Sequence, residues 1–465
     1  MSTFISIIGL FLALFLLIYL AFKGHSVIII APIVAMVAVI FSSGGNAHLM
    51  ADYTETYMIG FANYAKSYFP LYLFGAVFAK IMEVSGYADA VSHVIAKKLG
   101  KEKAILSVVL CCAILTYGGV SLFVVTFVVL PIAISLFRQA DIPKRLIPGS
   151  IALGAFTFTM TAMPGSPQVQ NTIPMTYFGT DAFAAPVLGI LASILIFGFG
   201  MLWLTKREKS ARSKGEGYGS HVDDSKDLAA SEKELPSILH PVIAFLLIVG
   251  VNLLFSKVYY PGSDAAYLEQ YGTKLSAVSG NWSVLIALLA ASIYLILVSL
   301  PRLQKSLKGD LKTAASNSLM PLINSCAVVG FGAVIKGLAI FGIIQAFILS
   351  ISANPLASEI LAVNLLCGMT ASASGGLGAT LEALAPTFIN AGAKIGIGPE
   401  VLHRVASISS GGLDSLPHNG ATVTTLSLCN INHKEGYLDM FVCSVAIPIG
   451  TAIIIAILAS LGIRC

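Results

Sequence analysis

The chain has 465 residues, of which 11 % are charged and 56 % hydrophobic, with a mean hydropathy of +0.86. A soluble globular protein carries roughly 25 % charged residues, so this composition excludes a soluble enzyme, a nucleic-acid binder and a disordered scaffold. It predicts a polytopic membrane protein. The seven cysteines lie in or beside apolar segments, at spacings that suit neither a zinc site nor a disulfide framework, and we interpret them as packing residues.

Crossing the hydrocarbon core takes about 20 apolar residues in a helix. The first stretch carries no charge and lacks the basic leading region of a cleaved signal, so we expect it to be a retained span. The predicted spans are Thr3–Phe22, Ser26–Phe41, Ser67–Met82, Phe183–Leu204, Ile238–Phe255, Trp282–Leu300, Ser316–Ile335 and Leu438–Leu461.

Four further apolar stretches are dense in Gly, Pro, Ser and Thr and cannot be simple spans. Broken backbone at membrane depth persists only where it is buried in protein or lines a wet cavity. These stretches are Ala104–Phe137, Leu146–Met175, Leu361–Asn390 and Val401–Asn430.

A polar tract, residues 205–237, holds seven basic and seven acidic residues and divides the chain nearly in half. We interpret it as a flexible cytoplasmic linker between an N-terminal transmembrane part (1–204) and a C-terminal one (238–465). Short motifs of the first part recur in the second at offsets of 253 to 257, such as Tyr117-Gly-Gly-Val120 and Ser374-Gly-Gly-Leu377. The two halves are therefore predicted to be repeats.

Basic residues indicate how the repeats are oriented. Lys97, Lys98, Lys101 and Lys103 follow the third span, whereas the equivalent 342–360 has no Lys or Arg. The cluster after Leu300 likewise has no counterpart after Phe41. Because positive charge favours the cytoplasmic side, the repeats are predicted to be inverted, an architecture of secondary transporters.

Two segments could form the tips of re-entrant hairpins, Thr161–Thr172 and Ser409–Thr422. Each joins apolar stretches through Pro, Gly and short hydroxyl or amide side chains. A half-helix N-terminus in such a segment presents free N–H groups and suits a carboxylate. The alternative is that these segments are solvent loops.

The double glycines at Gly118-Gly119 and Gly375-Gly376 allow a helix to unwind or another backbone to approach. We expect broken helices there that face the hairpin tips. Ordinary close packing of membrane helices remains the alternative.

Ionisable residues at membrane depth are costly, and each is a candidate for function. Glu382 and Asp414 could hold a proton or coordinate Na⁺, and His418 could bind an anion or carry a proton. Structural ion pairs are the alternative for each. No metalloprotease or phosphate-binding loop motif is present, and a lone Glu400-x-x-His403 is weak evidence for a metal, so the chain is not expected to be an enzyme. A passive anion channel remains open, because channels also use broken helices.

Around Thr116–Pro174 and Leu361–Leu426 the sequence resembles the gluconate permease (GntP) family of the ion transporter superfamily. The resemblance rests on Tyr117-Gly-Gly-Val-Ser121, Thr161–Thr172, Ser374-Gly-Gly-Leu-Gly378 and Ser410–Asn419. Within it, Ala162–Asn171 is similar to the branch of 3-hydroxybutyrate permeases.

This resemblance implies an inner-membrane, multi-pass proton symporter of a small hydroxy-monocarboxylate, without a cofactor. It implies a homodimer with an all-α elevator-type fold of inverted repeats, re-entrant hairpins and broken helices. Gluconate or another sugar acid is the alternative substrate, and Na⁺ the alternative coupling ion. Glu382, Asp414 and His418 are the coupling candidates. The predicted substrate-binding residues are Tyr117, Gly118, Gly119, Ser166, Gln168, Asn171, Thr172, Ser374, Gly375, Gly376, His418, Asn419 and Thr422.

Overall fold

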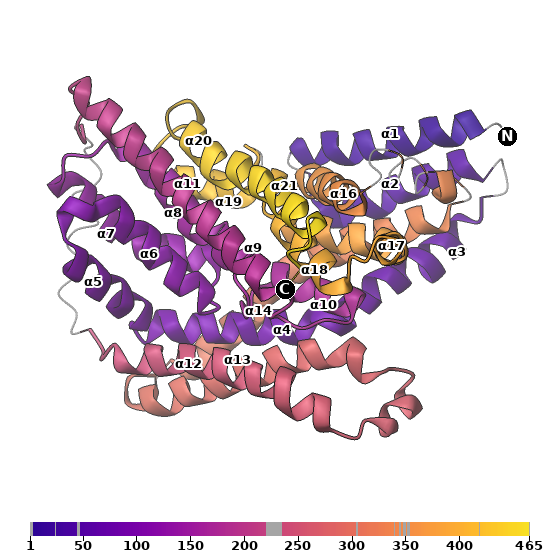
Figure 1. Cartoon of the computed structure of the whole chain (residues 1–465), viewed down its shortest axis with the longest axis horizontal. Coiled ribbons are helices and arrows are strands. Elements are labelled where there is room, and N and C mark those ends of the chain that lie inside the picture. The colour runs from indigo at the N-terminus through magenta and orange to yellow at the C-terminus, as the bar shows by residue number, and fades with distance from the viewer. Residues whose placement is uncertain are drawn as a thin grey trace.

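The computed structural model describes residues 3–23, 25–43, 47–219, 235–303, 306–338, 340–343, 346, 350, 354–417 and 419–464. These residues are almost entirely helical, and no strand occurs among them (Figure 1). An all-α fold was predicted from the apolar composition, and the described part of the chain confirms it.

The first half forms ten helices apart from the short α3 (Leu49–Ala51). They are α1 (Thr3–Phe22), α2 (Val27–Ser42), α4 (Met58–Val84), α5 (Tyr87–Leu99), α6 (Ala104–Tyr117), α7 (Leu122–Gln139), α8 (Ile147–Ala155), α9 (Phe158–Thr161), α10 (Val169–Phe178) and α11 (Pro186–Ser213).

The second half follows a similar order of long, paired and short helices. They are α12 (Leu239–Leu254), α13 (Leu275–Leu303), α14 (Leu307–Gly337), α16 (Pro355–Thr370), α17 (Ala373–Lys394), α18 (Pro399–Ser410), α19 (Gly420–Leu428), α20 (His433–Phe441) and α21 (Ile447–Ser460).

Six helical stretches are long and apolar enough to cross a membrane: Leu49–Val84, Pro186–Ser213, Leu239–Gly262, Leu275–Leu303, Leu307–Gly337 and His433–Ser460. Each contains one of the predicted spans almost completely. The first two predicted spans correspond to α1 and α2, of which α1 has the predicted bounds. Hydropathy located these elements because a helix that crosses the hydrocarbon core needs a continuous run of apolar residues.

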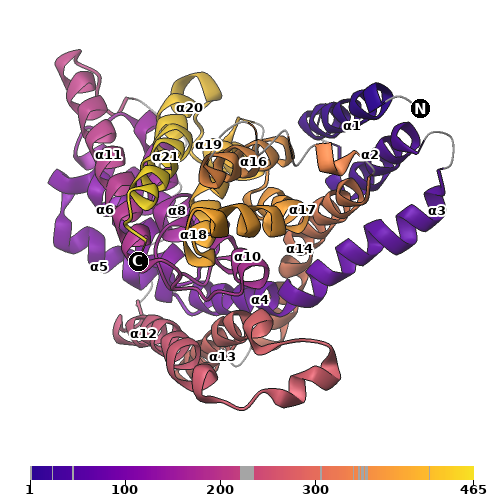
Figure 2. The same cartoon turned by 45° about the vertical axis from the view of Figure 1, so that its right-hand side comes forward.

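Helix α14 packs along α4 at the centre of the molecule, and α12 and α13 form a layer on the other side of α4 (Figure 1). A large apolar core runs through both halves. A smaller one lies between α1, α2 and α14 and includes Leu17, Val34 and Phe331. Helix α10 of the first half lies against α17 and α18 of the second (Figure 2), so the segments rich in Gly and Pro meet between the halves.

The predicted linker starts later than its composition suggested, because α11 continues to Ser213. The last turns of α11 carry side chains that form hydrogen bonds and ion pairs with other elements. Arg207 Nε donates to Asp439 Oδ1 of α20 at 2.8 Å, and Trp203 Nε1 donates to the same oxygen at 3.0 Å. Arg145, just before α8, donates to Asp439 Oδ2 at 3.2 Å and to both oxygens of Glu216. Asp439 is fully buried, so these donors compensate its charge. Residues 220–234 of the linker lie outside the described residues.

The Arg145–Glu216 pair predicts a pH dependence of stability. The hydrogen bond from Arg145 lowers the pKa of the Glu216 carboxyl below its usual value of 4.5. A lowered pKa contributes stability above the unfolded-state value, and this contribution is lost as the pH falls through the folded-state value. We therefore expect Glu216→Gln to melt below the wild type at neutral pH and the gap to narrow as the pH falls below the usual carboxyl value of 4.5. Melting curves of both proteins across this range, with the exposed Glu435→Gln as control, would show it; a gap that persists in acid would contradict it.

Candidate substrate site

The double glycines lie at or beside the turns of two helical hairpins: Gly118-Gly119 lie between α6 and α7, and Gly375-Gly376 lie at the start of α17, just after the turn that follows α16. Helix α6 packs beside α7, and α16 beside α17. The first turn, residues 118–121, contains Gly119 at φ +91°, a conformation that glycine adopts without strain. The second turn has Ala371 at φ +49° and Ser372 as the N-cap of α17, whose hydroxyl accepts from Gly375 N–H at 3.1 Å. The expectation of broken helices at these glycines is therefore wrong, because the positive φ reverses the chain and the following helix returns alongside.

The two segments predicted as hairpin tips are instead interruptions between successive helices. Residues 162–168 separate α9 from α10, and residues 411–419 separate α18 from α19. The described residues of α8 and α10 do not pack side by side, and neither do those of α18 and α19. We call these interruptions break 1 and break 2, and the two turns tip 1 (118–121) and tip 2 (371–372). Pro and Gly end the helices here, but the chain does not reverse onto itself.

Tip 1 is bound to break 1. The amide nitrogen of Gln168 donates to Thr116 O at 2.7 Å and to Val120 O at 3.3 Å. Tyr117 OH donates to Pro164 O at 2.9 Å. Thus Tyr117 and Gln168, both predicted to bind substrate, hold the tip against the break.

Tip 2 is bound to break 2 in a similar way. Asn419 is the N-cap of α19: its Oδ1 accepts from the N–H groups of Ala421 and Thr422 at 2.7 and 3.1 Å. Its Nδ2 donates to Ala371 O at 2.8 Å. Asn419 and Ala371 both follow Gln168 and Val120 by 251 residues, so the same type of contact recurs in each half.

This dual role of Asn419 makes a testable prediction. Asn419→Ala removes a helix cap, which costs about 1 kcal/mol, and also detaches tip 2 from break 2. Asn432→Ala is a matched control, because Asn432 caps α20 through Glu435 N–H at 3.1 Å without reaching a hairpin. We expect comparable losses of thermal stability but reduced uptake only for Asn419→Ala. Equal uptake by the two variants would contradict this role.

Arg404 of α18, which is fully buried, forms a junction between α18 and the residues on either side of break 1. Its Nη1 donates to Asn171 Oδ1 at 2.9 Å and to Thr161 O at 3.4 Å. Its Nε and Nη2 donate to Ala184 O at 3.1 and 2.8 Å, and Nη2 also lies 3.4 Å from Ala182 O. All of these acceptors are neutral oxygens, and no ion pair joins Arg404 to a carboxylate among the described residues. A positive charge is therefore held at this junction between α18 and break 1.

Neighbouring polar groups complete this junction. His403 lies with Nδ1 2.6 Å from Thr180 Oγ1 and Nε2 3.3 Å from Asn171 Oδ1. Ser407 Oγ donates to Thr161 O at 2.6 Å. Asn171 also donates to Ser166 O and Ala182 O, at 2.9 and 3.0 Å. Asn171 was predicted to bind substrate, and in this conformation its amide connects α10 to break 1 and to α18.

The remaining predicted residues differ in their surroundings. Ser166, Thr172 and Thr422 are buried and donate to nearby carbonyls. Ser374 Oγ lies 2.9 Å from Ser325 Oγ, which lies 3.2 Å from Tyr72 OH, so a group of hydroxyls surrounds the start of α17. Gly118 and Gly376 are sites of close packing, against Phe245 and Cys367 respectively. His418 lies outside the described residues.

The acidic candidates lie apart from each other. Glu382 is 3.5 Å from Lys336 Nζ of α14 and accepts from Tyr177 OH at 3.3 Å, so it connects α17 to α14 and α10. Asp414 lies in the short 3₁₀ helix η9 (Leu413–Ser415) of break 2, buried, and accepts from Ser415 Oγ at 3.3 Å. Asp414 therefore lies within break 2, whereas Glu382 takes part in contacts that connect three helices.

Arg404 was missed as a site residue by the sequence reasoning, although a signal was present. His403 and Arg404 are adjacent charged or titratable residues in a stretch otherwise made of apolar and small side chains. The rule applied to Glu382 and Asp414, that ionisable residues at membrane depth are candidates, applies equally to them.

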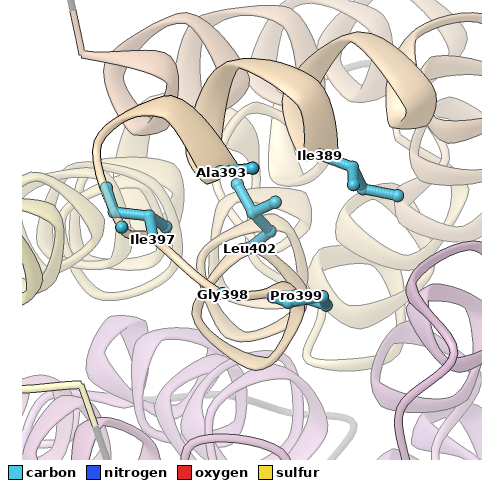
Figure 3. A pocket seen from close by; sticks show the side chains of 7 residues that line it. Ile389, Ala393, Ile397, Gly398, Pro399 and Leu402 are labelled. Carbon is cyan, nitrogen blue, oxygen red and sulfur yellow. The ribbon is translucent and has the colours of Figure 1, made fainter.

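A separate pocket of about 350 Å³ lies where α17 is followed by α18 (Figure 3). Its lining is apolar and comes from Ile389, Ala393, Gly396, Ile397, Gly398, Pro399 and Leu402. A carboxylate needs donors or positive charge, so this pocket does not suit an anionic ligand.

Sequence comparison places the chain in a family. A family model described as GntP family permease matches residues 3–375. The chain belongs to the GntP permease family. As a permease with at least six apolar helices of spanning length, it is a multi-pass membrane transporter.

Several relatives of this GntP family permease are transporters. The transporter YxjC of Bacillus subtilis (strain 168) is 39 % identical over 97 % of this chain and 98 % of its own. The high-affinity gluconate transporter of Escherichia coli (strain K12) is 29 % identical over 39 % of each chain. In fold, the chain is similar to the crystal structure of the Alcanivorax borkumensis YdaH transporter, described as having an unusual topology, with a TM-score of 0.58 and 17 % identity. That similarity covers 91 % of this chain and 90 % of the other.

Proposed function

We propose that this permease is a secondary active transporter of small hydroxy-monocarboxylates such as 3-hydroxybutyrate, driven by protons. The observation that carries the proposal is the charge of Arg404 at the junction between α18 and break 1, bonded to neutral oxygens. A buried positive charge without a contacting carboxylate favours an anion from outside the chain. Helix α10 begins after break 1 and α19 after break 2, and the N-terminus of each adds positive dipole charge at its break.

Recognition of a hydroxyl group is supported by polar atoms beside break 1. Thr116 Oγ1 and Gln170 Oε1 are buried and have no hydrogen-bond partner among the described residues. The carbonyl of Thr116 already holds Gln168, so this hydroxyl lies next to the contact between tip 1 and break 1. A buried polar atom without a partner costs about 1–3 kcal/mol, which a substrate hydroxyl would recover. Gluconate, with more hydroxyls, is the second candidate and is the substrate named for the Escherichia coli relative.

We further propose that the halves are inverted repeats that work in an elevator-type homodimer. The recurrence of tip-to-break contacts at an offset of 251 residues supports the repeat. The elevator movement and the dimer rest on the resemblance to the ion transporter superfamily, whereas the placement of the linker on the cytoplasmic side rests on the basic residues at its start.

Binding to the purified protein tests the substrate class. A bound ligand stabilises the native state, so a thermal-shift screen should show concentration-dependent stabilisation by 3-hydroxybutyrate or gluconate. The matched amides, which keep the hydroxyls and lose the charge, should have no effect. Equal stabilisation by the amides, or none by any carboxylate, would contradict the proposal.

The coupling ion is tested in sealed vesicles. If protons are the coupling ion, adding substrate outside the vesicles should alkalinise the medium as uptake proceeds. A sodium requirement without a pH change would indicate Na⁺ instead. Flux that only dissipates a substrate gradient would favour a passive anion channel.

A further inference from the structure

Glu359 of α16 is an acidic residue that neither the sequence reasoning nor the contacts of the site explain. It lies in the first arm of the second hairpin and is fully buried. Both carboxyl oxygens are inaccessible to solvent and lack a hydrogen-bond partner among the described residues. No other residue of α16 is charged.

The elements packed against α16 supply no cation for it. Helices α1 and α21 contain no charged residue. On α18, Arg404 and His403 are bonded at the junction with break 1, and Glu400 is exposed. On α17, Glu382 is paired with Lys336 and Lys394 is exposed; the remaining neighbour, η9, contributes the acid Asp414.

An ionised carboxylate without a partner in such surroundings is strongly unfavourable, and the group takes up a proton instead. We propose that Glu359 binds the coupling proton: it is protonated in the conformation described here, and releases the proton when α16 separates from the elements packed against it. On release the O–H bond breaks, the proton passes to water and the carboxylate becomes hydrated. This inference rests on the proposed function of a proton-driven carrier.

Glu359 fits this role better than the other acids. Glu382 has a cation and a tyrosine hydroxyl as partners, and Asp414 accepts from Ser415. Each partner stabilises the ionised form of these two groups. Only Glu359 among the three lacks such a partner in the described structure.

Its position separates coupling from substrate binding. Glu359 precedes Ala371 of tip 2 by twelve residues, about 18 Å along a helix. Its carboxyl oxygens bond to no described group of the tips or breaks, so we infer that Glu359 acts through the movement of the hairpin arm rather than by contact with the substrate. Substitution should leave substrate binding intact and remove the link to the proton.

Glu359→Gln tests this, because glutamine resembles the protonated acid but cannot release a proton. In proteoliposomes we expect the variant to bind 3-hydroxybutyrate and exchange it across the membrane, while losing pH-gradient-driven accumulation and substrate-induced alkalinisation. Glu400→Gln, an exposed acid on α18, is the control and should behave like the wild type. Accumulation by Glu359→Gln, or its loss in Glu400→Gln as well, would overturn the proposal.

A second measurement does not depend on transport. Infrared difference spectra of detergent-solubilised protein should contain a protonated carboxyl band at neutral pH that Glu359→Gln removes and Asp414→Asn leaves. Absence of that band would show Glu359 to be ionised and overturn the inference. If the wild type takes up no carboxylate, the proposed function fails instead, whereas the band reports on Glu359 alone.

Discussion

Replacing Arg404 with glutamine is expected to abolish uptake and to lower the stability of the protein by about 1–3 kcal/mol. The change removes the charge at the junction and leaves the carbonyl of Ala184 without the two donors that Arg404 supplies, whereas Thr161 O keeps Ser407 and Ala182 O keeps Asn171. Uptake by reconstituted protein and thermal melting by fluorescence-detected size exclusion measure the two effects.

Two further variants separate the charge from the packing. Arg404→Lys keeps the charge but cannot reach all of these acceptors, so we expect reduced stability with residual uptake. Arg212→Gln removes an exposed arginine that pairs with Glu208 on the same helix and should change little, since such pairs contribute about 0.3–0.5 kcal/mol. Normal uptake by Arg404→Gln would remove this residue from substrate attraction.

Gly376→Ala is expected to destabilise the second hairpin by roughly 3 kcal/mol. A Cβ at this position would come within 2.4 Å of the backbone nitrogen and Cα of Cys367 in the opposite arm. Because these are backbone atoms, α16 and α17 must move apart, which shifts tip 2 away from Asn419. The expected result is a lower melting temperature together with loss of uptake.

Gly250→Ala is the matched control for this glycine. Gly250 also lies within a helix, α12, but an added Cβ would meet no atom within 4 Å. Alanine should stabilise that helix by up to about 1 kcal/mol. If Gly376→Ala melts no lower than Gly250→Ala, the close contact between the hairpin arms is not required.

The apolar spans could be predicted from the sequence because a membrane helix consists of an uninterrupted run of apolar residues, which the sequence shows directly. The bounds of α1 agree with prediction, and the other spans are recovered within longer helices. The four stretches rich in Gly and Pro were also located correctly as irregular.

The geometry of these irregular stretches could not be predicted. A Gly-Gly pair allows either an interruption or a reversal, and the choice depends on φ at Gly119 and Ala371 and on packing against the returning helix. The chain reverses its direction at tips 1 and 2, beside the glycine pairs, and its helices are interrupted at residues 162–168 and 411–419. Composition cannot distinguish these outcomes, because both need residues that end a helix.

The polar contacts were predicted only in part. Gln168, Asn171 and Asn419 do lie at the tips and breaks, but in this conformation their amides bind the protein itself. Arg404 and Glu359 were missed. The burial and the partners of each residue depend on elements distant in the sequence.

Gradient-driven accumulation most directly tests the central claim that this permease carries small carboxylates with protons. Purified protein in proteoliposomes would receive labelled 3-hydroxybutyrate, and in parallel gluconate, under an imposed inward proton gradient. We predict that at least one accumulates above its external concentration and that collapsing the gradient releases it. Equilibration without accumulation, or no uptake of either compound, would contradict the account.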